Sequence, residues 1–115
     1  MDVERVFQAL ADNHRRHLLD LLHQTDGQTL TELCTHLPMT RFGVMKHLGI
    51  LEEAGLVVTH KVGREKLHYI NPIPMLGVAD WVGRYRTLWF ERMERLDHYL
   101  MELQNKEQNN DQDKP

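Results

Sequence analysis

The chain has few of the residues that covalent cross-links and membrane-spanning segments require. Its 115 residues include one cysteine, Cys34, so no disulfide can form within a chain, and a reducing cytoplasm is the expected compartment. No apolar run approaches the length that crosses a bilayer, and no secretion signal is evident. These absences predict a small soluble globular domain that does not associate with membranes.

Signatures of enzyme chemistry are also missing. The sequence has no nucleophile with a base at a recognisable spacing, no glycine loop for phosphate and no carboxylate pair expected to share a pocket. The polar residues that stand out are predicted on convex elements, whereas enzyme sites are usually concave. We therefore expect no catalytic residues and no cofactor.

What the middle of the chain does contain is two short helical patterns separated by a tight break. Thr29 followed by Glu32 is a capping-box pattern, in which hydroxyl and carboxylate can each satisfy a free amide at the helix start. Pro38 is predicted to end this first helix. Thr40 can then cap a second helix that runs to about Ala54. Two such helices in tandem are typical of a helix-turn-helix.

The second helix is predicted to have a buried face and an exposed face. Val44, Leu48 and Leu51 recur at helical spacing and should face the core. The first two turns contain no acidic residue, which suits a polyanionic partner. The residues expected on the exposed side are Arg41, Phe42, Met45, Lys46 and Gly49.

A predicted strand pair with a basic tip follows directly, within residues 56–71. Glycine at position 63 permits the positive backbone angle that a hairpin turn often needs. Lys61, Arg64 and Lys66 surround this turn with positive charge. An ordinary helical hairpin with a solvated polar face is the simpler interpretation of the helices, but it does not account for the basic strand pair. The combination favours a winged helix-turn-helix.

Three strings of residues extend this interpretation over nearly the whole chain. They are FQALADNHRRHLLDLL (residues 7–22), MTRFGVMKHLGILEEAGLV (residues 39–57) and REKLHYIN (residues 64–71). In this order they resemble the opening "LADPTRRRIL" pattern, the recognition helix and the second wing strand of the ArsR-type winged-helix bacterial repressors. Asn13 and His14 stand where that family usually has Pro and Thr. The resemblance implies a dimeric transcriptional regulator, usually a repressor, that binds an inverted repeat in a promoter.

The last third of the chain predicts one long helix with a continuous apolar stripe after Pro74. Such a helix has more apolar surface than a small core can cover, so part of it should meet a second copy together with the first helix, residues 2–11. The alternative, folding back on its own domain, must hold for some positions. The predicted dimer interface comprises Val3, Phe7, Val78, Trp81, Val82, Tyr85, Trp89, Met93 and Leu96.

The expected fold is therefore mainly helical, with about five helices and one small hairpin. Residues 1–105 are predicted to form a single DNA-binding and dimerisation domain. Residues 106–115, KEQNNDQDKP, have nothing to bury and predict a disordered tail.

The net charge of −3 is unusual for a DNA-binding protein, but its distribution is uneven. The segment from Arg41 to Lys66 carries five basic and three acidic residues. Within this segment Arg41 is the best candidate for reading a guanine, because a guanidinium can bond both guanine acceptors. The residues predicted to contact double-stranded DNA are Thr40, Arg41, Phe42, Met45, Lys46, His47, Lys61, Arg64 and Lys66.

These residues are given different roles. Lys46 is expected to hold phosphate, and Phe42 to touch a thymine methyl group. Lys61, Arg64 and Lys66 should grip the flanking backbone or the adjacent minor groove. For His47, donation to DNA and a purely structural hydrogen bond are both open.

Regulation is less visible in the sequence. Many ArsR-type proteins carry paired cysteines before the recognition helix, whereas this chain has Cys34 and, where the second cysteine would lie, His36. Two ligands do not make a tetrahedral metal site, so a buried core role for Cys34 is preferred over metal or thiol sensing. The chain resembles the subgroup without a complete metal motif. A small-molecule effector, a protein effector and a protein-interaction adaptor remain open alternatives.

Overall fold

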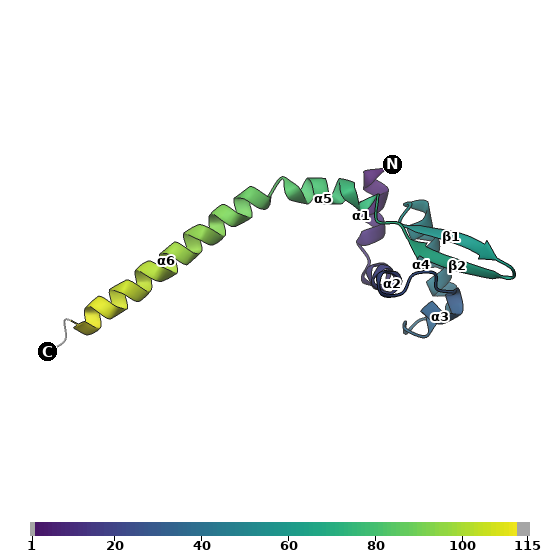
Figure 1. The fold of residues 1–115 in the computed structure, drawn as a ribbon, viewed down its shortest axis with the longest axis horizontal. Coiled ribbons are helices and arrows are strands. Elements are labelled where there is room, and N and C mark those ends of the chain that lie inside the picture. Colours follow the sequence, from purple (N-terminus) through teal and green to yellow (C-terminus); the bar gives the residue numbers. More distant parts are fainter. Residues whose placement is uncertain (1, 113–115) are drawn as a thin grey trace. The chain divides into compact units, whose positions relative to one another are not determined.

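The computed structural model describes residues 2–112, which form six helices and one two-stranded hairpin (Figure 1). The chain consists of two compact units, residues 1–79 and residues 80–115, and each is described by itself. No helix within the described range is both long enough and apolar enough to cross a membrane. The elements are α1 (Val3–Leu10), α2 (Asn13–Gln24), α3 (Leu30–Cys34), α4 (Arg41–Glu53), β1 (Val57–Val62), β2 (Glu65–Ile70), α5 (Met75–Gly83) and α6 (Arg86–Gln112).

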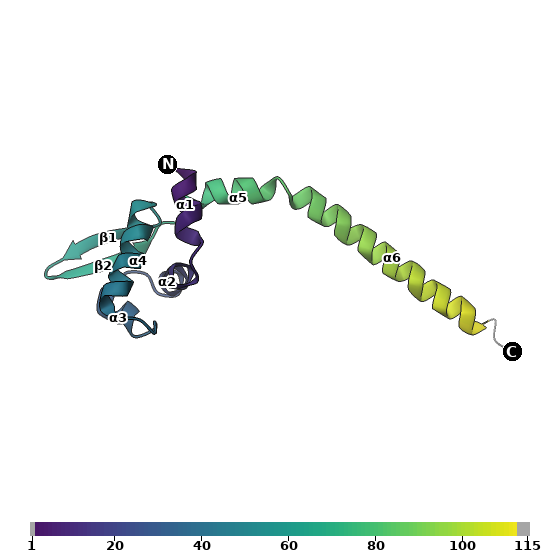
Figure 2. The same ribbon diagram turned by 180° about the vertical axis from the view of Figure 1, so that it is seen from behind.

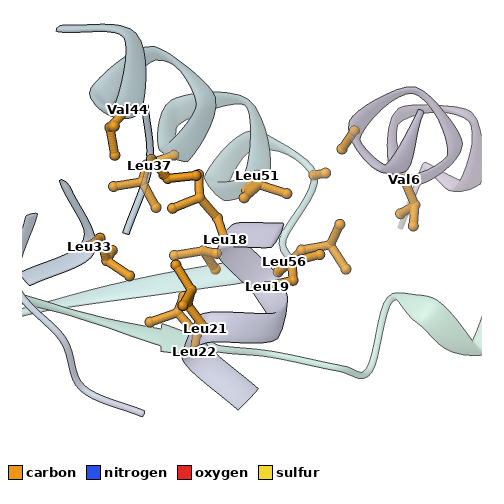
Figure 3. Close-up of a cluster of buried hydrophobic side chains, with 14 residues drawn as sticks. Val6, Leu18, Leu19, Leu21, Leu22, Leu33, Leu37, Val44, Leu51 and Leu56 are labelled. Atoms are coloured by element: carbon orange, nitrogen blue, oxygen red, sulfur yellow. The ribbon is translucent and has the colours of Figure 1, made fainter. Parts of the chain in front are cut away.

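A leucine-rich core holds the first unit together (Figure 3). It is built from the inner faces of α1, α2, α3 and α4 and from the start of β1, and many of its side chains are fully enclosed. The predicted inner face of α4 is confirmed, because Val44, Leu48 and Leu51 are all buried. The largest fully enclosed side chains are Leu18, Leu22, Leu33, Leu51, Leu56, Val6 and Val44.

The first helix of the helix-turn-helix is shorter than the sequence predicts. Its cap is as expected, since the Thr29 hydroxyl accepts from the Glu32 amide at 3.2 Å. The Glu32 carboxylate, however, accepts from the Thr29 hydroxyl and not from a backbone amide. The helix ends at Cys34 and not at Pro38, because the Thr35 hydroxyl donates to the Glu32 carbonyl at 2.7 Å and tight turns follow. Competition from this local hydroxyl ends the helix before the proline does.

The second helix, α4, begins and ends as predicted. The Thr40 hydroxyl accepts from the Gly43 amide at 3.1 Å and so caps its first turn. At the other end Gly55 has φ +79°, and the Leu56 amide donates to the Leu51 carbonyl at 2.9 Å. This is the Schellman arrangement that a glycine after a helix favours. The direction of α4 is therefore fixed at both ends.

The hairpin lies beside α4 in both views (Figures 1 and 2) and is the wing of the fold. Its strands pair antiparallel from Val57↔Ile70 to Val62↔Glu65, with a two-residue turn in which Gly63 has φ +63°. The base of the wing is fastened to the loop before α3. There the Gly27 amide donates to the His68 carbonyl at 2.9 Å, and the His68 amide donates to the Gln28 carbonyl at 2.8 Å. The buried Gln28 side chain ties this loop to α2 by donating to the carbonyls of Leu21 and Thr25, at 2.9 and 2.7 Å.

The long terminal helix predicted from the apolar stripe is interrupted. After Gly83 the Arg84 and Tyr85 amides donate to carbonyls three residues back, those of Trp81 and Val82. This tighter turn separates α5 from α6 and accounts for six helices where about five were expected. The helix α6 is described to Gln112, beyond residue 105, where the sequence predicted a tail. Residues 113–115 lie outside the described range.

Candidate nucleic-acid interface

The exposed side of α4 carries basic and apolar side chains that the core does not use. We call Arg41, Phe42, Met45 and Lys46 the reading face; all four are exposed. Phe42 is 75% exposed, so its ring is free to contact a partner. Thr40, which caps the helix, is exposed beside them.

Some residues on the exposed side of α4 line a groove and others do not. Arg41, Met45 and Gly49, spaced four residues apart, line a groove between α3, α4 and the wing, whereas Phe42 and Lys46 do not. The groove has a volume of about 820 Å³. Its lining residues are Thr29, Leu30, Thr31, Glu32, Arg41, Met45, Leu48, Gly49, Glu52, Thr59, Arg64, Glu65, Lys66 and His68.

Arg41 has a contact that holds its side chain in the groove. Its Nη1 donates to the Thr31 hydroxyl of α3 at 3.0 Å. A planar guanidinium has five N–H donors, so this bond orients the fork while leaving donors for a further acceptor. Sequence reasoning missed this role of Thr31, because nothing in a helix of five residues indicates which side chain the next helix will meet.

The wing concentrates positive charge where the fold alone does not favour it. Lys61 and Lys66 are directly opposed across the hairpin, and like charges in that position are destabilising. Arg64 lies in the turn between them, and all three side chains are exposed. Among the side chains of residues 2–108, no acidic group lies within ion-pair distance of these three side chains or of Arg41 and Lys46. A surface anion would relieve this repulsion.

A buried histidine connects the wing to the end of α4. The ring of His68 lies 3.1 Å (Nδ1) from the Thr59 hydroxyl, which donates to the Glu52 carboxylate at 2.6 Å. Because the Thr59 hydroxyl donates its proton to Glu52, its oxygen must accept in the bond with His68, and the His68 Nδ1–H is the donor. Burial lowers the pKa of His68 below its ordinary value; the Glu52 charge opposes this shift and Lys66 adds to it. His68 is therefore neutral at pH 7.

His47 faces the interior side of α4 and is partly buried. Its Nδ1 lies 3.3 Å from the Arg15 guanidinium of α2. A structural hydrogen bond of the kind left open by the sequence is therefore present. The Nε2 atom remains available for a second partner.

The residues considered for metal or thiol chemistry are not gathered into a site. Cys34 is partly buried and packs against the leucine core, while His36 is exposed. In the described part of the chain, no three histidine, cysteine, aspartate or glutamate side chains are grouped closely enough to hold a metal ion.

The predicted dimer residues divide by exposure. Within the first unit, Val3 is exposed and Phe7 is partly buried, whereas Val78 packs against the core of its own chain. Within the second unit, Val82 is partly buried, and the exposed ones are Trp81, Tyr85, Trp89, Met93 and Leu96. The α6 residues form a stripe of Trp89, Met93, Leu96, Leu100 and Leu103 with alternating steps of four and three, the spacing of a coiled-coil seam.

Comparisons with known proteins agree with this geometry. A family model described as a helix-turn-helix domain matches residues 10–60, which include α2, α3 and α4. A helix-turn-helix transcriptional regulator of Bacillus subtilis, YuzN, is 36% identical over 78 residues, which are 63% of this chain and 85% of that protein.

Solved structures show the same fold. The crystal structure of an ArsR family transcriptional regulator is 36% identical, with a TM-score of 0.66, and the match covers 75% of this chain and 88% of that one. A homodimeric winged helix-turn-helix DNA-binding domain from Mycobacterium bovis is 26% identical, with a TM-score of 0.59. The match covers 74% of this chain and 81% of that one.

The lowered pKa of His68 predicts acid sensitivity of the fold. Since the unfolded chain binds this proton more readily, the contribution of neutral His68 is complete above its unfolded pKa of about 6.5 and is lost as the pH falls through the lower folded pKa. Replacement His68→Asn keeps a donor for Thr59 and should flatten this loss. Urea unfolding at pH 7.5 and at pH 5 measures the difference; an equal loss in both proteins would contradict the prediction.

Proposed function

The chain belongs to the ArsR family of winged helix-turn-helix transcriptional regulators, and on that basis we propose that it binds an inverted-repeat promoter operator as a homodimer. The observation that carries this proposal is the set of five basic side chains on α4 and the wing that have no acidic partner among the side chains of residues 2–108. Three of them, Arg41, Arg64 and Lys66, line one groove, on a fold whose relatives include transcriptional regulators.

The amino-terminal half of α4 enters the major groove in this proposal. Arg41 reads a base, because its guanidinium is already oriented by Thr31 and can bond both acceptors of a guanine. Phe42 and Met45 supply apolar contact to thymine methyl groups, and Thr40 donates from the helix start. Lys46 and the Nε2 of His47 bind phosphate. Each good bidentate pair contributes roughly 1 to 3 kcal/mol of discrimination between bases.

The wing positions the protein without choosing the sequence. Lys61, Arg64 and Lys66 contact the flanking phosphates or the adjacent minor groove, where an anion relieves the repulsion between the two opposed lysines. Because these contacts release counterions, affinity should fall steeply with salt.

A second copy is needed because operators of this kind contain two half-sites about one helical turn apart. The relative from M. bovis is homodimeric. In this chain the surfaces proposed for the partner are the exposed side of α1, with Val3 and Phe7, and the apolar stripe of α6. Five apolar side chains spaced as a coiled-coil seam, each between 40% and 61% exposed, favour pairing with another helix.

Repression follows from occupying the promoter in the bacterial cytoplasm, and release follows from any change in the spacing of the two α4 helices. With Cys34 packed against the core and His36 exposed, the chain fits the subgroup without a complete metal motif. A small molecule or a protein is then the class of effector. Operator affinity that is unchanged by thiol alkylation would support this assignment.

Two arginine substitutions separate base reading from phosphate binding. Arg41→Ala should reduce the preference for operator over scrambled duplex by roughly tenfold, the equivalent of one base contact. Arg64→Ala should weaken both duplexes alike, since it removes a phosphate contact. Mobility shifts at fixed salt measure both. Equal losses on the two duplexes for both variants would contradict the assignment.

A glycine substitution tests how closely α4 approaches the DNA. Nothing lies within 4 Å of a Cβ built at Gly49, so Gly49→Ala fits the free protein and should stabilise it by about 1 kcal/mol through helix propensity. Operator affinity should nevertheless fall, because the added methyl group occupies the groove. Urea unfolding and a mobility shift on the same preparation measure both effects. Unchanged affinity would show that the backbone at this position stays clear of DNA.

Paired lysine substitutions on α6 test the dimer. Leu96→Lys places a charge in the apolar stripe and should shift the protein toward monomer. The control is His98→Lys, which adds the same residue two positions away, outside the stripe, and keeps the pairing of that position with Glu102. Sedimentation velocity over a range of concentrations measures the shift. A wild-type association constant for Leu96→Lys would exclude α6 from the interface.

A further inference from the structure

One arginine outside the proposed interface, Arg15 of α2, bonds to both α1 and α4. The Arg15 side chain, at the start of α2, is only 14% exposed. Its Nε donates to the Ala9 carbonyl at 2.7 Å and its Nη2 to the Gln8 carbonyl at 3.0 Å. Its Nη1 lies 3.3 Å from the Nδ1 of His47 in α4. Such a side chain connects the end of α1 to the inner side of the recognition helix.

The contacts with α1 satisfy groups that the helix leaves unpaired. The last four carbonyls of a helix have no partner within it, and α1 ends at Leu10. Arg15 gives the Ala9 carbonyl a partner and is a second donor to the Gln8 carbonyl, which also accepts from the Ala11 amide at 3.2 Å. Its neighbour Arg16 donates to the Leu10 carbonyl at 2.7 Å. Both arginines therefore cap α1, but of the two it is Arg15 that also bonds to α4.

The contact with α4 also selects one tautomer of the His47 ring. A guanidinium has only donors, so the Nδ1 atom of His47 must be the acceptor and carries no proton. The proton of the neutral ring is then on Nε2, the atom proposed to bind phosphate. The orientation of the His47 ring and its donor are thus set by a residue of α2.

An acidic residue keeps the guanidinium in place. The Asp12 carboxylate lies 3.9 Å from Arg15 Nη1 and accepts from the His14 and Arg15 amides at 2.8 and 3.2 Å. Burial raises the pKa of Asp12, but these amides and the Arg15 charge together bring it below its ordinary value. The carboxylate is ionised at neutral pH, so Arg15 is held between a fixed anion, two carbonyls and His47.

We infer that Arg15 is a positioning residue for operator recognition, which holds α4 and the His47 ring in register with α1 and so sets the spacing of the two reading helices. This inference rests on the proposed function, since α1 is there assigned to the partner surface. A displacement of α1 by a partner or effector would reach the recognition helix through this side chain. Fixed geometry affects base contacts more than phosphate contacts, so specificity is the property that Arg15 controls.

The test compares Arg15→Lys with Arg16→Lys in the full chain. Both keep the charge and remove the fork that caps α1, but only the first removes a contact with α4. For an operator selected by the wild-type protein from random duplexes, Arg15→Lys should lower the operator-to-scrambled affinity ratio roughly tenfold, the effect of one charged hydrogen bond. Affinity for scrambled duplex should be retained, and Arg16→Lys should stay within about twofold of wild type. Equal losses in the two variants would overturn the inference.

A double substitution tests whether the effect passes through His47. In a His47→Ala background Arg15→Lys should cause no further loss of the affinity ratio, because its partner in α4 is gone. An undiminished loss would mean that Arg15 acts by another route and would refute the inference.

A measurement without DNA separates this inference from the proposed function. The ¹⁵N resonance of His47 Nδ1 in the free protein reports the hydrogen bond that this atom accepts. It should move in Arg15→Met and stay in place in Arg16→Met. If the wild-type protein selects no operator, the proposed function fails while this result still decides on the Arg15 contact; an Nδ1 resonance that both variants leave unchanged would overturn it.

Discussion

The burial of one side of α4 is the constraint on which the rest of the structure depends. Val44, Leu48 and Leu51 are enclosed by the core, and each such side chain contributes about 1.5 to 3 kcal/mol relative to exposure. A rotation of the helix would lose this energy, so the opposite side is fixed toward solvent. Arg41, Phe42, Met45 and Lys46 lie on the exposed side for that reason, and the bond from Arg41 to Thr31 then orients one of them.

Local hydrogen bonds then fix the ends of α4 and its position relative to the elements around it. The Thr40 cap and the Gly55 turn set where α4 begins and ends. Two networks reach it from the side: Arg15 joins its inner side to α1, and Thr59 with His68 joins Glu52 near its end to the wing. The helix α4 is therefore joined to α1, α2 and the wing by polar contacts that are geometrically more specific than leucine packing.

The sequence predicted features that depend on local spacing. The inner face of α4, its caps and the glycine turn of the wing follow from helical period, hydroxyl caps and the backbone freedom of glycine, and the structure confirms them. The predictions of helix length failed where short-range bonds compete. The Thr35 hydroxyl ends α3 early, and the turn after Gly83 divides a helix that the apolar stripe predicts as continuous. The roles of Thr31, Thr59 and Arg15 were missed because each depends on a contact between separate elements.

In the proposed homodimer two copies of α4 lie about one turn of DNA apart. A spin label at position 46, in the middle of α4, introduced as Lys46→Cys in a Cys34→Ser background, gives this separation by pulsed dipolar spectroscopy on the free protein. The account predicts one distance distribution centred near the helical repeat of DNA, roughly 34 to 36 Å between the helices. The absence of any dipolar coupling, or a separation that does not match successive major grooves, would contradict it.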